Sequence, residues 1–132
     1  MKALVIDDSR TMRRIISKIL TGLGFTVFEA GDGQEALSVM ENEPDIALCC
    51  VDWNMPVMDG LTFVKHVRAV DQWRSVTLMM ITTESEHGQI VRALAAGAHE
   101  YVIKPFTPEA IAQKLEFLGL LPLAEAEMSE EV

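Results

Sequence analysis

Residues 3–20 read ALVIDDSRTMRRIISKIL and contain a complete strand, turn and helix. The aliphatic run Ala3–Ile6 is followed at once by two aspartates, as expected for a short buried strand of a parallel sheet. Beyond the aspartates, apolar residues recur every three or four positions from Met12 to Leu20. This spacing predicts an amphipathic helix that ends near Gly22. The stretch is therefore interpreted as the first β–α unit of the fold.

The same alternation continues along the chain. Further strands are predicted at 25–29, 46–51, 78–81 and 101–103, and helical spacing appears around 36–40, 61–67, 90–94 and 111–118. Asp59 is expected to cap the third helix, and Thr107 with Pro108 to begin the last one. Five strands that alternate with five helices predict an α/β protein whose parallel sheet is covered on both faces.

Length and composition indicate one small acidic domain. The chain has 132 residues, of which 49% are hydrophobic, and no internal repeat or linker is visible. We expect one domain at 1–121 and a disordered acidic tail at 122–132, where four glutamates occur without a basic residue. Cys49 and Cys50 are adjacent and bridge poorly, which favours a reduced, cytoplasmic protein.

The charge and the hydropathy exclude several classes of partner. Acidic residues outnumber basic ones by 20 to 11, and the net charge of −9 disfavours binding to nucleic acid or to an anionic membrane. No apolar stretch approaches the roughly 18 residues of a membrane span. The first apolar run is also shorter than a signal-peptide core of about 7–15 residues. We expect a soluble monomer that binds other proteins.

Charged or hydroxyl side chains follow four of the five predicted strands. Asp7 and Asp8 follow the first, Asp52 the third, Thr82 the fourth and Lys104 the fifth. The carboxyl ends of parallel strands meet at one edge of a sheet, where ligands bind. A single polar residue at a strand end is common, but four together predict a functional site.

If the first and third strands are neighbours, three carboxylates converge at that edge. Ionised carboxylates cannot crowd together without a counter-charge, because like charges raise one another's pKa. Mg²⁺ would resolve this conflict, since it accepts one or two carboxylates together with phosphate oxygens. One aspartate could then attack phosphorus and form an acyl phosphate. Lys104 and the hydroxyl of Thr82 are the candidates to stabilise the phosphoryl oxygens.

These residues resemble the receiver domain of two-component response regulators, and among them the single-domain chemotaxis regulators. The segments that carry the resemblance are Asp7–Arg14 (DDSRTMRR), Asp52–Gly60 (DWNMPVMDG), Ile81–Glu84 (ITTE) and Tyr101–Phe106 (YVIKPF). The resemblance covers residue 2 to about residue 120. It implies a flavodoxin-like, doubly wound α/β fold, with a five-stranded parallel sheet in the order 2-1-3-4-5 flanked by five helices.

The resemblance also implies a role for each site residue. Asp52 matches the phosphoryl-accepting aspartate, and Mg²⁺ would be held by Asp7, Asp8, Asp52 and the backbone carbonyl of Asn54. Lys104 matches the lysine that pairs with the phosphoryl group, and its bond to Pro105 is expected to be cis. Thr82 matches a switch hydroxyl, and Tyr101 an aromatic residue that turns inward on activation. Asn54 and Glu84 resemble the pair that sets phosphate lifetime.

The implied function is a stand-alone phosphorylation switch rather than a conventional enzyme. Such a protein takes its phosphoryl group from a histidine kinase and catalyses only its own phosphorylation and dephosphorylation. Few residues remain after the fifth helix for an output domain, so its output would be binding to another protein. The expected target is a flagellar motor switch protein, bound at a face with Ile90, Tyr101, Ile103 and Lys114. The alternative is a phosphorelay intermediate that passes its phosphate to a histidine phosphotransfer protein.

Other functions are less consistent with the residues. A flavodoxin-like nucleotide binder needs a small, Gly-rich or hydroxyl-rich phosphate loop, and Ser9–Thr11 is too bulky. A magnesium-dependent phosphatase places two aspartates one residue apart after its nucleophile strand, whereas Asp7 and Asp8 are adjacent. A receiver-like binding module without chemistry would lack one of the five reactive positions, and none is missing. Trp53 is expected at the rim of the site and Trp73 in a loop.

Overall fold

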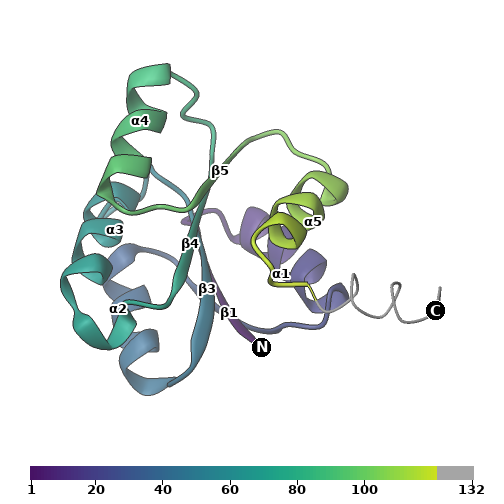
Figure 1. Cartoon of the computed structure of the whole chain (residues 1–132), viewed down its shortest axis with the longest axis horizontal. Helices are drawn as coiled ribbons and strands as arrows, with labels where there is room; N and C mark the ends of the chain where they lie inside the picture. Colours follow the sequence, from purple (N-terminus) through teal and green to yellow (C-terminus); the bar gives the residue numbers. More distant parts are fainter. Residues whose placement is uncertain (122–132) are drawn as a thin grey trace.

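The computed structural model describes residues 1–121 as one sheet between two layers of helices (Figure 1). The strands are β1 (Lys2–Ile6), β2 (Thr26–Ala30), β3 (Ile46–Val51), β4 (Thr77–Thr82) and β5 (Glu100–Ile103). The helices are α1 (Arg10–Gly22), α2 (Gly33–Asn42), α3 (Gly60–Ala69), α4 (His87–Ala96) and α5 (Pro108–Phe117), with a short 3₁₀ helix, η1 (Asp71–Trp73). All strand pairs are parallel and the order is β2-β1-β3-β4-β5. The doubly wound α/β fold is therefore confirmed.

The two faces of the sheet bury two separate cores, because successive strand residues point to opposite faces. In β1, Ala3 and Val5 pack toward α1 and α5, whereas Leu4 and Ile6 pack toward α2, α3 and α4. Cys49 and Cys50 in β3 divide in the same way, so the two thiols lie on opposite faces and remain free. Burial raises the pKa of both thiols, which keeps them protonated.

The expected helix starts are present, but the prediction for Trp73 and several strand bounds are wrong. Asp59 accepts a hydrogen bond from the Thr62 amide at 2.8 Å, and Thr107 caps α5 through the Ala110 amide at 3.1 Å. Trp73 is not in a loop: it closes η1 and is buried. Strand β2 runs from Thr26 to Ala30 instead of 25–29. Strands β1, β4 and β5 each begin one residue earlier than predicted, and β4 also ends one residue later.

Arg68 in α3 fixes the amino end of β4 and the carboxyl end of α4. Its guanidinium donates to Val76 O at 2.8 Å, to Gly97 O at 3.0 Å and to His99 Nδ1 at 3.2 Å. The same His99 nitrogen accepts the Leu78 amide hydrogen at 3.1 Å. These bonds hold α4 in place at the edge of the sheet opposite the candidate site.

The predicted tail at 122–132 lies outside the described residues, and that prediction stays untested. Within residues 1–121, no helix has the length and apolar character needed to cross a membrane.

Candidate functional site

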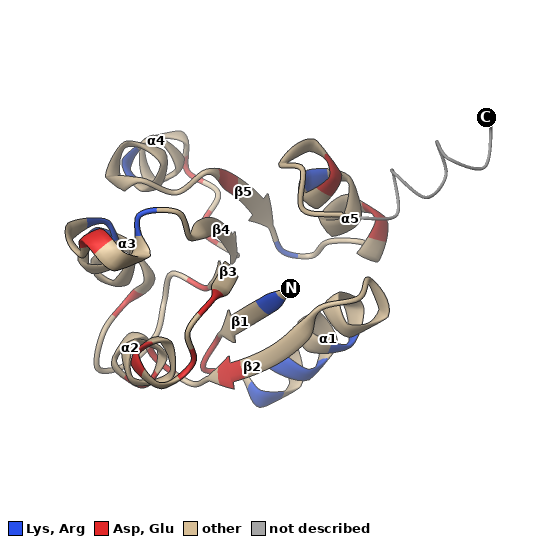
Figure 2. Cartoon of the chain, turned by 60° about the horizontal axis from the view of Figure 1, so that its bottom comes forward, with Lys and Arg blue, Asp and Glu red and all other residues tan. Residues whose placement is uncertain are grey.

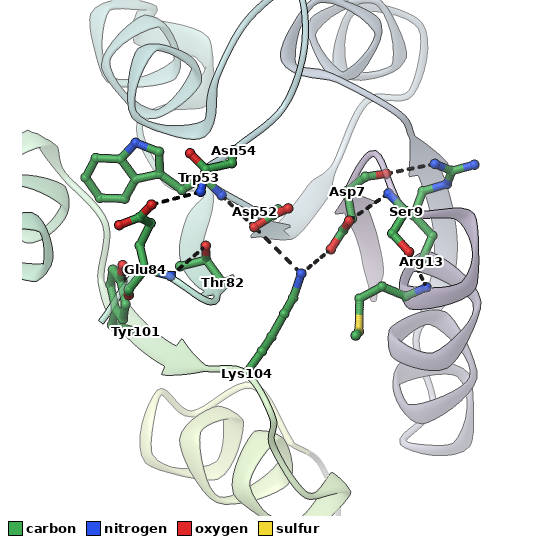
Figure 3. A network of polar contacts seen from close by, with 11 residues as sticks. Asp7, Ser9, Arg13, Asp52, Trp53, Asn54, Thr82, Glu84, Tyr101 and Lys104 are labelled. Carbon is green, nitrogen blue, oxygen red and sulfur yellow. Dashed lines mark hydrogen bonds and ion pairs between the residues drawn. The ribbon is translucent and has the colours of Figure 1, made fainter. Parts of the chain in front are cut away.

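The loops that follow β1, β3, β4 and β5 bring the predicted site residues together at the carboxyl edge of the sheet (Figure 3). Asp7 and Asp52 follow adjacent strands, because β1 pairs with β3. Lys104 follows β5 and its side chain reaches across this edge. Its Nζ lies 2.7 Å from Asp7 Oδ2 and 3.7 Å from Asp52 Oδ1. The Lys104–Pro105 peptide bond is cis, as expected.

Three carboxylates form an acidic cluster, and two of them pair with this lysine. Asp7, Asp8 and Asp52 each offer an oxygen, and these three oxygens lie within 4.8 Å of one another. Asp7 is only 1% exposed and Asp52 only 8%, whereas Asp8 is open to solvent. Lys104 offsets one of the three negative charges. Oxygen ligands at this spacing, with two negative charges left uncompensated, fit a hard divalent cation such as Mg²⁺.

The surroundings of Asp52 raise the pKa of its carboxyl group. Burial is the main cause, the nearby charge of Asp7 adds to it, and Lys104 opposes both. The Trp53 amide donates to Asp52 Oδ1 at 2.9 Å, which orients the carboxylate. A partly buried carboxylate with a raised pKa is more basic than one in water, and such groups occur frequently at functional sites.

The loop behind Asp52 closes through a very tight approach at Gly60. The Gly60 amide donates to Trp53 O at 2.8 Å, and α3 starts directly against the Asp52 main chain. A Cβ atom at residue 60 would lie 2.1 Å from Asp52 O. The sequence predicted the helix cap at Asp59 but not this contact of Gly60. Nothing in the local sequence distinguishes it from an ordinary turn glycine.

Residues of β4 and β5, and of the loops after β3 and β4, form a second group beside the cluster. Thr82 is fully buried, and its Oγ1 accepts the Glu84 amide hydrogen at 3.3 Å. Asn54 Nδ2 donates to Glu84 Oε1 at 2.9 Å, so these two predicted residues meet at the mouth of the site. Tyr101 is buried in the inward position and its hydroxyl donates to Glu84 O at 2.7 Å. Burial raises the pKa of Tyr101, which keeps this donor protonated.

The predicted partner face lies beside this second group. Ile90 in α4 is half-buried, whereas Ile103 in β5 is 43% exposed. Lys114 in α5 donates to Glu100 Oε1 at 3.1 Å, which ties α5 to β5. Tyr101 also lies in β5 but faces the interior and is only 9% exposed, so it contributes little surface to this face.

Arg13 was not singled out in the sequence, although it contacts the site. Its Nη1 donates to the main-chain carbonyl of Asp7 at 2.7 Å, and its Nε pairs with Glu29 Oε1 at 3.3 Å. An arginine on an amphipathic helix resembles any solvated charge, so no sequence signal marked it.

A doubly wound sheet with a lysine-bridged acidic cluster at its carboxyl edge defines a class of signalling domains, the receivers. The response regulator receiver domain model matches residues 3–116, and the chain belongs to this family. Members of this family are regulators in signalling rather than conventional enzymes.

The chain is similar to chemotaxis proteins in particular. It is 46% identical over 117 residues to a CheY homolog of Campylobacter jejuni, covering 88% of this chain and 90% of that protein. It is also 46% identical to CheY1 of Helicobacter pylori, covering 88% and 94%. Two solved structures have the same fold. Vibrio cholerae CheY4 matches with a TM-score of 0.81 at 36% identity, covering 87% and 95% of the two chains. A Borrelia burgdorferi CheX–CheY–BeF₃–Mg²⁺ complex matches with a TM-score of 0.84 at 27% identity, covering 89% and 88%.

Proposed function

We propose that this chain is a chemotaxis response regulator in which Asp52 accepts a phosphoryl group from a histidine kinase. Mg²⁺ would be held by Asp7, Asp8, Asp52 and the backbone carbonyl of Asn54. The observation that carries the proposal is the convergence of three carboxylates at one edge of the sheet, two of which pair with Lys104. The solved Borrelia relative that contains Mg²⁺ and a beryllofluoride group supports it.

Each residue has a definite task in the proposed transfer. A carboxylate oxygen of Asp52 forms the new bond to phosphorus while the phosphorus–nitrogen bond of the donor phosphohistidine breaks and the imidazole leaves. Mg²⁺, when bound, neutralises charge on the phosphoryl oxygens. Lys104 supplies a further positive charge beside Asp52. The Trp53 amide holds the Asp52 carboxylate in a fixed orientation for attack.

A phosphoryl group on Asp52 would add negative charge to the site. The response to this charge would pass through Thr82, Glu84 and Tyr101 to the surface beside β5. The Thr82 hydroxyl can donate a charge-assisted hydrogen bond to a phosphoryl oxygen on Asp52. To make this bond the Thr82 hydroxyl would move toward the phosphoryl group. Glu84 contacts both Thr82 and Tyr101 through its main chain, so a movement of Thr82 would reach β5. Tyr101 already occupies the inward position here. The proposed switch is therefore a shift between this arrangement and one with Tyr101 turned outward, and the two must differ by only a few kcal/mol.

Magnesium binding is expected to change the fluorescence of Trp53. The backbone amide of this residue donates to Asp52, and its ring is buried. Trp73 precedes β4 at the opposite edge and should contribute a constant background. A Mg²⁺ titration of the parent protein should give a saturable change, most of which disappears in Trp53→Phe. A full response in that variant would place the metal elsewhere.

The phosphorylated form is expected to decay quickly, and Asn54 and Glu84 are expected to control the rate. They meet at the mouth of the site, where a water in line with the phosphorus must enter. Replacing both with alanine should slow dephosphorylation several-fold, because the water loses its positioning groups. Glu86→Ala is the control, since Glu86 is an exposed acid of the same loop without a side-chain cap bond. An unchanged rate in the double variant would contradict the assignment.

Phosphorylation is expected to raise the affinity of the face formed by α4, β5 and α5 for a flagellar motor switch protein. An N-terminal peptide of such a protein should bind more tightly when beryllofluoride is present. Ile103→Ser should weaken binding, whereas Ile15→Ser should not, although the two isoleucines are 43% and 44% exposed. Ile15 lies in α1, on a different face. Equal affinity with and without beryllofluoride would favour a phosphorelay intermediate, tested by phosphate transfer to a histidine phosphotransfer protein.

A further inference from the structure

We propose that Arg13 is a positioning residue that sets the geometry of the Asp7–Asp8 pair. The inference rests on the proposed function, because it concerns the residues that would hold Mg²⁺. Its basis is the 2.7 Å hydrogen bond from Arg13 Nη1 to the main-chain carbonyl of Asp7.

With this bond, both main-chain polar groups of Asp7, which lies just beyond the end of β1, are hydrogen-bonded. The Asp7 amide donates to Ala30 O at 3.1 Å, and the carbonyl accepts from Arg13. The peptide planes on both sides of the Asp7 Cα are therefore held, and these planes set the direction of its side chain. The carbonyl plane also contains the nitrogen of Asp8, so the same bond orients the exposed Asp8. The Ser9 amide then locks Asp7 Oδ1 at 2.9 Å.

The guanidinium group of Arg13 is itself well placed. Its Nε faces Glu29 in β2 at 3.3 Å, and the Arg13 side chain is only 20% exposed. A planar guanidinium held by two hydrogen bonds has a fixed orientation, so it positions the Asp7 carbonyl better than a flexible ammonium group would. Arg13 therefore connects β2, α1 and the turn that carries the acidic pair.

Arg14 provides a matched control for the charge of Arg13. It is the next residue in α1, and it is exposed together with Arg10 and Lys18 on the basic outer side of that helix (Figure 2). Within residues 1–121, the Arg14 side chain makes no hydrogen bond or ion pair. Replacing either arginine with glutamine removes one positive charge from the amino-terminal half of α1, but only Arg13→Gln removes the bond to Asp7.

Loss of an arginine charge and loss of the contact to Asp7 should change the Mg²⁺ affinity in opposite directions. Removing a cation near three carboxylates leaves a more negative site and should tighten the binding of a divalent cation. Losing the support of a ligand group should weaken that binding, by about tenfold for groups directly behind metal ligands. Arg14→Gln should therefore bind Mg²⁺ as tightly as the parent protein or more tightly. Arg13→Gln should bind it about tenfold more weakly.

The test combines a Mg²⁺ titration with a measurement that needs no metal. Mg²⁺ affinity is followed by Trp53 fluorescence, and exchange of the Ser9 amide hydrogen is followed by NMR in metal-free buffer. Arg13→Gln should weaken Mg²⁺ binding and accelerate Ser9 exchange. Arg13→Lys, which keeps the charge and one donor, should lie between this variant and the parent. Urea unfolding of all variants separates local effects from a loss of global stability.

Two results would overturn the assignment. Mg²⁺ affinity in Arg13→Gln equal to or higher than in Arg14→Gln would show that only charge matters. Unchanged Ser9 exchange in both Arg13 variants would show that the turn does not depend on this contact. If the parent protein bound no Mg²⁺ at all, the proposed function would fail, while Ser9 exchange would still decide the role of Arg13.

Discussion

Replacing Gly60 with alanine is expected to destabilise the protein by about 3 kcal/mol and to distort the site at Asp52. The new Cβ would lie 2.1 Å from Asp52 O and 3.0 Å from Trp53 Cα. Both atoms belong to the main chain, so no side chain can rotate away to make room. Either α3 or the strand end that carries Asp52 must move.

Gly88→Ala is the control for this substitution. Gly88 also lies in the first turn of a helix, but a Cβ there meets nothing within 4 Å. Alanine should leave stability unchanged or raise it by up to about 1 kcal/mol, since glycine is the poorer helix former. Urea unfolding of both variants measures the difference. A Gly60→Ala protein as stable as Gly88→Ala would mean that α3 does not pack against the Asp52 main chain.

The sequence predicts those features that follow from local pattern. Ile46–Val51 is continuously apolar because β3 is central and buried on both faces, and this identified the strand with its correct ends. The site residues were found for a related reason. The carboxyl ends of parallel strands share one edge, so Asp7, Asp52 and Lys104 were expected at that edge once the strands were assigned. Whether they meet depends on the strand order, which the resemblance supplied and the structure shows.

Features that depend on distances between remote segments could not be predicted in this way. Phe25 was assigned to a strand because it is apolar, but its side chain packs in the core beside α1 and its amide bonds to Leu20 O. The contact between Arg13 and Asp7 and the close approach at Gly60 depend on tertiary packing. In the sequence, Arg13 resembles a surface charge and Gly60 a turn residue. The inward position of Tyr101 likewise comes from its bond to a loop 17 residues away.

Asp52→Asn is expected to abolish phosphorylation completely, the largest effect on function that the account predicts. Asparagine has nearly the shape of aspartate, but its amide is a very poor nucleophile toward phosphorus. The Trp53 amide can still donate to the side-chain oxygen at residue 52, so the loop should keep its conformation. Loss of phosphorylation would then result from the missing nucleophile and not from misfolding. Urea unfolding checks that the variant is as stable as the parent protein.

Asp59→Asn is the matched control, because Asp59 lies in the same loop and caps α3 through the Thr62 amide. Asparagine caps a helix almost as well as aspartate. This variant should therefore be stable and should be phosphorylated like the parent protein.

Mass spectrometry of the protein after incubation with acetyl phosphate and Mg²⁺ tests whether Asp52 is the phosphoryl acceptor. The parent protein and Asp59→Asn should each gain one phosphoryl group, mapped to Asp52 by peptide analysis. The adduct should be absent when a chelator removes the metal and absent in Asp52→Asn. A phosphoryl adduct of equal yield in Asp52→Asn, or one mapped to Asp7 or Asp8, would contradict the account.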